Sequence, residues 1–176
     1  MMSRLRLRIW TFIVIVSLLI ITLVIRNEWE LRNTPLPTSL HPVVAGKAER
    51  LVERSDEMGI SVVITEGFRS FDKQNELYNR GRTDDGNIVT YAKGGESYHN
   101  YGLAIDFAIR NSNGEVIWDL RYDGNANGKS DWMEVVQIAK ELGFEWGGDW
   151  SRFKDYPHLQ MDFGLTIRDL QRGKRP

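Results

Sequence analysis

A histidine and an aspartate stand seven residues apart in GGESYHNYGLAIDFAIR, on either side of a glycine. Apolar and small residues alternate from Leu103 to Ile109, which predicts a strand with Asp106 between two alanines on one face. Gly102 allows the chain before this strand to bend, so that His99 can fold back over Asp106 as a second metal ligand. A loop histidine beside an edge-strand carboxylate that faces water would give the same pattern, so the pair alone does not establish a site.

A second polar pattern lies near the C-terminus, in DYPHLQMD. The stretch HLQMD alternates as a strand does and places His158, Gln160 and Asp162 on one face. With His158 added, three nitrogen and oxygen ligands and one open position for water match a catalytic zinc site better than a closed structural one. Asp155, in the turn before this strand, is suited to take a proton from the attacking water without being a ligand.

Composition limits the chemistry that this chain can perform. The 176 residues are 41% hydrophobic and 27% charged, which is typical of a globular domain, and there is no cysteine. Disulfides, thiolate zinc sites and a cysteine nucleophile are therefore excluded. After residue 26 the chain holds 19 basic and 24 acidic residues, a net charge of about −5. Such a balance gives no indication of nucleic-acid binding.

The N-terminal stretch IWTFIVIVSLLIITLVI carries no charge over 17 residues and follows three arginines. It predicts a membrane-spanning signal anchor at residues 9–25, with residues 1–8 in the cytoplasm and the C-terminal part outside. Residues 26–42, which include three prolines, are expected to be a linker to an extracellular domain at residues 43–176. A cleaved signal peptide, which would give a secreted protein, is the alternative, but no A-x-A-like site follows the apolar stretch.

The remaining pattern predicts an α+β fold, with a small mostly antiparallel sheet flanked by helices and the zinc site on the sheet face. The helices are expected from about Val44 to Met58, Phe71 to Arg80 and Asp131 to Leu142, each followed by a glycine. The strands are expected at residues 60–65, 103–109, 115–120 and 158–162, with a hairpin turn at residues 111–114 and a long polar loop at residues 82–97.

Three stretches together resemble the VanY-type D-alanyl-D-alanine carboxypeptidase family of zinc peptidases. They are SYHNYGLAIDF, EGFRSFDKQNELYNRGRT and GFEWGGDWSRFKDYPHLQM, and the resemblance extends from about Leu40 to the C-terminus. They are most similar to the L-alanyl-D-glutamate endopeptidases of phage endolysins and Gram-positive cell walls. The resemblance implies zinc on His99, Asp106 and His158, with Asp155 as the general base. Many carboxypeptidases of the family have glutamate at this last position, whereas the endopeptidase branch has aspartate.

The same resemblance assigns further residues. It implies that Arg69 stabilises the scissile carbonyl as its oxygen gains charge, a role that suits a fixed guanidinium. Without the resemblance, a surface arginine paired with Glu66 or Asp72 would be the simpler interpretation. Ser97 and Gln74 are expected to support the site or bind the substrate. His41, beside a proline, is expected to be structural.

The stretch DGNANGKSDWME fits six positions of an EF-hand-type calcium loop. The expected ligands are Asp123, Asn125, Asn127, the carbonyl of Lys129, Asp131 and Glu134, with Gly128 at the sharp turn. A strand is predicted before the loop, so this would be an isolated calcium loop, comparable to one that some endolysins of the resembling branch carry. An Asn/Gly-rich turn capped by Asp131 is the alternative.

The sequence thus predicts a zinc-dependent, membrane-anchored and monomeric hydrolase that cuts the L-Ala-D-Glu bond of peptidoglycan stem peptides, with a second, calcium site. A D-alanyl-D-alanine carboxypeptidase is the alternative within the enzyme class. The alternative from another class is a wall-binding or calcium-sensing module of the same fold that hydrolyses nothing. The presence of both Asp155 and Arg69 favours catalysis.

Overall fold

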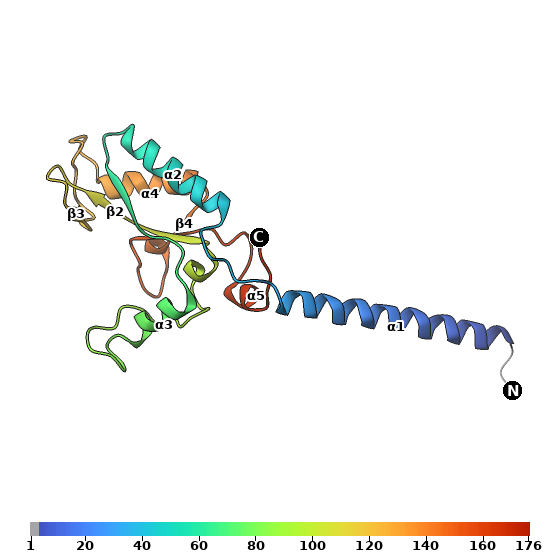
Figure 1. Cartoon of the computed structure of the whole chain (residues 1–176). Coiled ribbons are helices and arrows are strands. Elements are labelled where there is room, and N and C mark those ends of the chain that lie inside the picture. The colour runs from blue at the N-terminus through green and yellow to red at the C-terminus, as the bar shows by residue number, and fades with distance from the viewer. Residues whose placement is uncertain (1–3) are drawn as a thin grey trace. The chain divides into compact units, whose positions relative to one another are not determined.

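The computed structural model describes residues 4–176 as two compact units (Figure 1). One unit holds the N-terminal residues up to Pro35 together with Arg168–Pro176, and the other holds Leu36–Ile167. Residues 1–3 of the predicted cytoplasmic segment lie outside the described residues.

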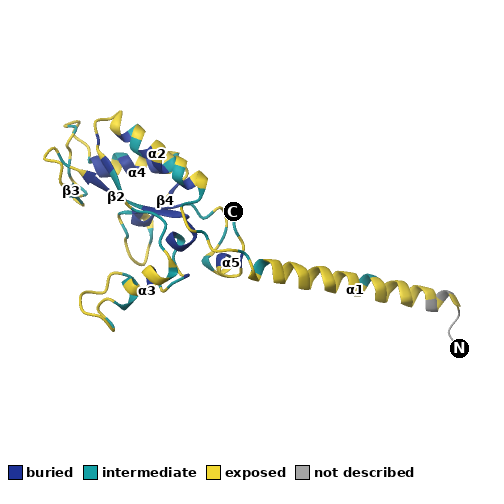
Figure 2. Cartoon of the chain, viewed as in Figure 1, coloured by how far each residue is buried: buried dark blue, intermediate teal, exposed yellow. Residues whose placement is uncertain are grey.

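The first unit is dominated by the helix α1, Arg4–Arg32. Its part from Arg8 to Arg32 is long and apolar enough to cross a membrane, and the apolar side chains on it are exposed (Figure 2). An N-terminal signal sequence would meet the same criteria. The helix continues seven residues beyond the predicted span, and an ion pair between Arg26 and Glu30 one turn later, at 2.8 Å, favours this extension. The predicted linker therefore begins as helix, and only residues 33–41 of it lie outside helices.

The second unit contains a five-stranded sheet in which all neighbouring strands pair antiparallel. The strands are β1 (Val62–Glu66), β2 (Ala104–Arg110), β3 (Val116–Ile117), β4 (Glu145–Trp146) and β5 (His158–Gln160), in the order β1-β2-β5-β4 with β3 also on β2. The predicted α+β class is confirmed. The strand expected at 115–120 is shorter, because the chain leaves the sheet after Ile117 and turns at Leu120 into the loop that follows. The two-residue strand β4 was not predicted.

Three helices of this unit match the predicted ones, and two of them cover one face of the sheet. They are α2 (Pro42–Asp56), α3 (Phe71–Asn79) and α4 (Asp131–Glu141). The pair α2 and α4 packs on the side to which the apolar residues of β2 point (Figure 1). Phe107 and Trp132 stack there with ring centroids 4.5 Å apart, and both are fully buried. Burial of two such large aromatic side chains stabilises the packing of α4 on the sheet.

His41 is structural, as expected: it caps α2 by accepting a hydrogen bond from the backbone of Val43, and its ring lies 5.0 Å from that of Phe163. A short helix α5, Ile167–Gln171, was not predicted. Its five residues are too few for a periodic pattern to appear.

The opposite face of the sheet carries a row of polar residues across three adjacent strands. Glu66 of β1 is paired with Asp106 of β2, and Asp106 is paired with His158 of β5. A bulge between Ile64 and Glu66 shifts the register of β1 at its end. Antiparallel pairing thus brings two predicted ligands, 52 residues apart in sequence, directly opposite each other.

Candidate metal centre

Three ligand atoms of the predicted triad converge on one point. His99 Nε2 lies 3.2 Å from Asp106 Oδ1 and 3.2 Å from His158 Nδ1, and His158 Nδ1 lies 3.3 Å from the same Asp106 oxygen. A tetrahedral zinc site with ligand distances of about 2.0–2.1 Å has edges of about 3.3 Å. Within residues 4–176, no other group of three or more His, Cys, Asp or Glu side chains converges in this way.

His99 reaches the sheet from a 3-10 helix, Tyr98–Tyr101. Ser97 and Asn100 form a capping box that fixes the start of this helix. Gly102 ends it in a left-handed conformation, and a Cβ at Gly102 would collide with the backbone oxygen of Ser39. The predicted bend at Gly102 is therefore required both by its φ and by the close approach of the linker.

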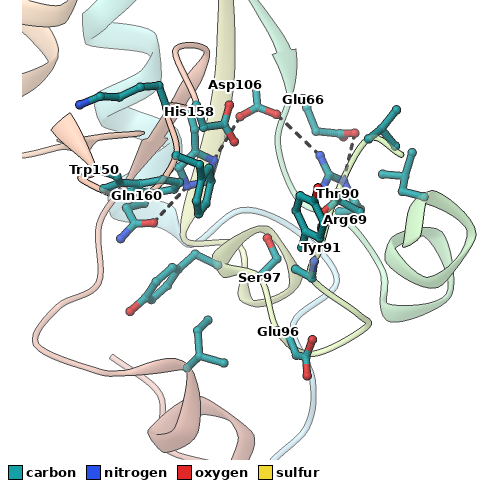
Figure 3. A pocket seen from close by; sticks show the side chains of 18 residues that line it. Glu66, Arg69, Thr90, Tyr91, Glu96, Ser97, Asp106, Trp150, His158 and Gln160 are labelled. Atoms are coloured by element: carbon teal, nitrogen blue, oxygen red, sulfur yellow. Dashed lines mark hydrogen bonds and ion pairs between the residues drawn. The ribbon is translucent and has the colours of Figure 1, made fainter. Parts of the chain in front are cut away.

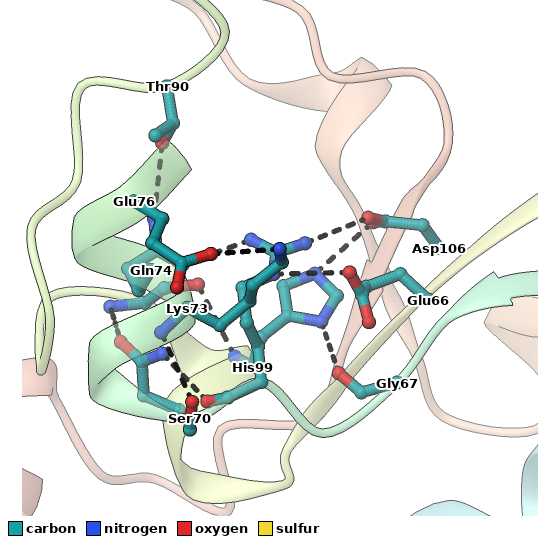
Figure 4. A network of polar contacts seen from close by, with 12 residues as sticks. Glu66, Gly67, Ser70, Lys73, Gln74, Glu76, Thr90, His99 and Asp106 are labelled. Atoms are coloured by element: carbon teal, nitrogen blue, oxygen red, sulfur yellow. Dashed lines mark hydrogen bonds and ion pairs between the residues drawn. The ribbon is translucent and has the colours of Figure 1, made fainter. Parts of the chain in front are cut away.

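Hydrogen bonds on the far side of each imidazole determine which nitrogen carries the proton. His99 Nδ1 lies 2.7 Å from the carbonyl oxygen of Gly67 (Figure 4), and His158 Nε2 lies 3.1 Å from the side-chain oxygen of Gln160 (Figure 3). Both oxygens are acceptors, so those nitrogens donate. The nitrogens that face Asp106 then present lone pairs. Three acceptors within 3.3 Å of one another fit a divalent cation, and this donor set fits zinc.

Asp106 is held as an anion. Burial by itself raises the pKa of this carboxyl group. The contacts with His158 and His99 lower the pKa by more than burial raises it, so the net pKa is well below the ordinary range. Its second oxygen, Oδ2, faces the guanidinium of Arg69 at 3.6 Å.

Arg69 is embedded in the wall of the site rather than free on the surface. Its side chain is 12% exposed and lies 3.3 Å from Glu66 and 3.0 Å from the side-chain oxygen of Gln74, in addition to Asp106 (Figures 3 and 4). The pairing with Glu66 that the sequence allows does occur, but inside the pocket. These contacts leave the guanidinium in one orientation.

Gln74 and Ser97 occupy different positions around the pocket. Gln74 is fully buried in α3, links Arg69 to the carbonyl oxygen of Ala92 and is not among the residues that line the pocket. Ser97 lines the pocket, and its hydroxyl accepts a hydrogen bond from the backbone of His99.

Asp155 lines the same pocket as Arg69, Asp106 and His158. Its turn is held against Gly147, whose carbonyl accepts from the Asp155 backbone at 3.2 Å, and a Cβ at Gly147 would collide with Asp155. Burial raises the pKa of the Asp155 carboxyl, His158 lowers it, and Asp106 raises it again, with a net increase. A higher pKa makes the carboxylate a stronger base.

The pocket around these residues has a volume of about 930 Å³ (Figure 3). Its apolar lining comes from two loops, from α3 and from the start of α5. It consists of Leu77, Val89, Tyr91, Trp150, Phe153 and Ile167. The ring of Trp150 lies 5.2 Å from that of His158. Aromatic residues within otherwise polar loops of the sequence were the signal that could have predicted this lining. The signal for Gln160 was its position on the same strand face as His158.

In the loop Asp123–Glu134, the carboxylates do not converge on one point as the three ligand atoms of the triad do. Asp123 accepts hydrogen bonds from the backbone of Asn127 and Gly128, and the side-chain amide of Asn127 donates to both oxygens of Glu134 at 2.9 and 3.0 Å. Ser130, not Asp131, caps α4. Asp131 is 1% exposed: one oxygen accepts from Gly124, and the other has no hydrogen-bond partner.

Comparison with known proteins decides the family. The chain is 61% identical over 158 residues to the peptidoglycan L-alanyl-D-glutamate endopeptidase CwlK of Bacillus subtilis, an alignment that covers 86% of this chain and 95% of that protein. The chain belongs to the VanY-type D-alanyl-D-alanine carboxypeptidase family of metallopeptidases. A family model described as D-alanyl-D-alanine carboxypeptidase matches residues 90–161, which contain all three triad residues and Asp155.

Two further relatives of this metallopeptidase are more distant. An L-alanyl-D-glutamate peptidase of Listeria phage A118 is 35% identical over 116 residues, 66% of this chain but only 36% of the phage protein. The crystal structure of the L,D-carboxypeptidase DacB from Streptococcus pneumoniae superposes with a TM-score of 0.52 at 18% identity, and covers 78% of this chain and 79% of that one. This last similarity concerns the fold alone.

Proposed function

We propose that this metallopeptidase is a zinc-dependent peptidoglycan hydrolase that cleaves the bond between L-alanine and D-glutamate in stem peptides. The observation that carries the proposal is the convergence of three lone-pair ligands beside Asp155 and Arg69 in one pocket. The identity of 61% to an L-alanyl-D-glutamate endopeptidase supports the choice of bond. So does the aspartate at position 155, since the resembling carboxypeptidases often have glutamate there.

The residues of the pocket divide the reaction between them. Zinc, when bound by His99, Asp106 and His158, supplies a Lewis acid for the scissile carbonyl. Asp155 accepts the proton of the attacking water and returns it to the amine of the leaving D-glutamate. Arg69, fixed by Glu66 and Gln74, stabilises negative charge as it develops on the carbonyl oxygen.

Digestion of purified cell wall tests this proposal. New amino-terminal D-glutamate in the soluble fragments is expected. Release of free D-alanine alone would instead indicate a D-alanyl-D-alanine carboxypeptidase. Zinc binding and sedimentation with intact wall, without any new terminus from wall or synthetic stem peptides, would indicate the wall-binding alternative.

The helix α1 supports a location at the cell membrane. Its apolar part is followed by the peptidase unit and preceded by Arg4, Arg6 and Arg8, so we place the N-terminus in the cytoplasm and the peptidase outside, as a single-pass monomer. Fractionation of cells separates this arrangement from secretion after cleavage, because a cleaved chain would begin after α1 and appear in the medium.

The loop Asp123–Glu134 is proposed as a calcium site. The buried Asp131 oxygen without a partner is the observation that favours an ion over a simple turn. Asp123 already accepts from the backbone of Gly128, which has a φ of 83° and forms the sharp turn that such loops need. Asn125 and Asn127 would have to turn their oxygens inward, away from the contacts with Glu134.

A further inference from the structure

His158 is the first member of a hydrogen-bonded chain that leaves the metal centre and ends at the surface. Its Nε2 lies 3.1 Å from Oε1 of Gln160, and Nε2 of Gln160 donates to Glu145 at 3.0 Å. Gln160 and Glu145 are direct cross-strand partners on β5 and β4. Gln160 is 7% exposed, whereas Glu145 is an exposed residue outside the pocket.

The two histidines of the triad differ in how their protonation is fixed. His99 donates to the carbonyl of Gly67, a backbone group that is only an acceptor. The partner of His158 is a side-chain amide, which can present either an oxygen or an NH₂ group after a half-turn about its last torsion. The tautomer of His158 therefore depends on what holds the amide of Gln160 in place.

Glu145 is the group that holds it. An ionised carboxylate only accepts, so Glu145 binds the NH₂ end of Gln160 and directs the oxygen toward His158. That oxygen requires a proton on His158 Nε2 and leaves the lone pair on Nδ1, the nitrogen that faces His99 and Asp106. With the amide reversed, the NH₂ group would face Nε2 and favour the proton on Nδ1, where it blocks metal binding.

We infer that Glu145 is a positioning residue for the metal centre: acting through the amide orientation of Gln160, it selects the tautomer of His158 that binds zinc. This inference rests on the zinc site of the proposed function, but it concerns metal affinity and not the bond that is cut. Partners of this kind behind a ligand typically change metal affinity by about 10- to 100-fold.

The experiment uses the full chain in detergent micelles and measures the zinc Kd by competition with a chelator. Glu145→Lys replaces the acceptor by a donor and is expected to weaken zinc binding by about 10- to 100-fold. Glu145→Gln, whose own carbonyl can still accept, should remain near wild type. Glu49→Lys, an exposed change of the same charge on α2, serves as the matched control and should have no effect.

A double-mutant cycle separates this mechanism from simple charge repulsion. Gln160→Leu removes the amide, so adding Glu145→Lys to it should cause no further loss of zinc affinity. Nitrogen NMR of the metal-free imidazoles should show the His158 proton on Nε2 in wild type and on Nδ1 in Glu145→Lys.

Three outcomes would overturn the inference. They are a wild-type Kd in Glu145→Lys, an unchanged His158 tautomer in that variant, and a full effect of Glu145→Lys in the Gln160→Leu background. If the wild-type chain itself binds no zinc, the proposed function and the inference both fail. If the wild-type chain binds zinc and one of the three outcomes occurs, the inference alone fails.

Discussion

The triad and the loop Asp123–Glu134 both contain residue types that bind metals, yet the fold prepares them to different degrees. In the triad, three ligand atoms already lie as far apart as the corners of a zinc-sized tetrahedron. In the loop, the side-chain amides of Asn125 and Asn127 donate hydrogen bonds to Glu134, and the carboxylates do not converge on one point. The first site is organised by the sheet, whereas the second would have to be organised by its ion.

The difference follows from what supports each residue. Asp106 and His158 are fixed by antiparallel pairing of two strands, and His99 by a capped helix that docks on the same sheet. The loop ligands come from one segment of 12 residues with little regular structure before α4. A site organised by the sheet is predicted to lose function when a ligand is lost but to remain folded. A site organised by its ion is predicted to change stability instead.

The largest effect is expected from removing a triad ligand. His99→Ala, Asp106→Ala and His158→Ala should each abolish zinc content and hydrolysis of stem peptides, because three protein ligands leave none to spare. Metal analysis of the purified full chain and a peptide assay provide the measurements. Retention of stoichiometric zinc in any of the three variants would show that the site has a different ligand set.

Asp155→Asn should separate catalysis from metal binding. The amide keeps the shape of the side chain but cannot accept the proton, so the rate is expected to fall by about 100-fold or more while zinc content stays at the wild-type level. The raised pKa of Asp155 also implies that the wild-type rate decreases as the pH falls through that value, since the base must be ionised. Zinc loss in this variant would mean that Asp155 is a ligand and not the base.

The contrast between the two sites also explains how far the sequence could be interpreted. Strand periodicity at Leu103–Ile109 and at His158 suggested the triad, and the family resemblance assigned it, because strand pairing leaves few alternatives for where these residues lie. The pairing of Arg69 with Glu66 was one expectation from their spacing. The contacts of Arg69 with Gln74 and Asp106 were not predictable, since they join it to the helix α3 and the strand β2. Likewise, β4 has only two residues, too few for a pattern, so the role of Glu145 became visible only from its pairing with Gln160.

A smaller effect is expected from the loop, and it concerns stability. Calcium should raise the free energy of unfolding by RT ln(1 + [L]/Kd), about 2.7 kcal/mol at a hundredfold excess over Kd. Glu134→Gln should reduce the melting temperature in calcium to that of the calcium-free protein and leave zinc content unchanged. Glu49→Gln is the control. A wild-type melting temperature that does not respond to calcium from micromolar to millimolar concentration would show that the loop is only a turn.

The smallest effect is expected from Asp131→Asn. Without calcium, this substitution of a buried residue should maintain or raise the melting temperature instead of lowering it. Burial raises the pKa of Asp131, hydrogen bonds from Gly124 and Asn125 lower it, and the charges of Asp123 and Glu134 raise it again, with a net increase. The folded protein therefore binds this proton more tightly than the unfolded chain does. Without calcium, the corresponding contribution to stability is present at acidic pH and is lost as the pH rises through the folded pKa.

Asparagine removes the buried charge and keeps an oxygen for the backbone of Gly124. In buffer stripped of calcium, Asp131→Asn should thus melt at or above the wild-type temperature at neutral pH, and this advantage should shrink as the pH is lowered. In calcium the order should reverse, because the variant has lost a charged ligand and with it the calcium response. Melting curves at acidic and neutral pH, with and without calcium, provide the measurement. A variant that is less stable than wild type without calcium, yet gains as much stability from calcium, would place Asp131 in the structural role of an ordinary turn residue.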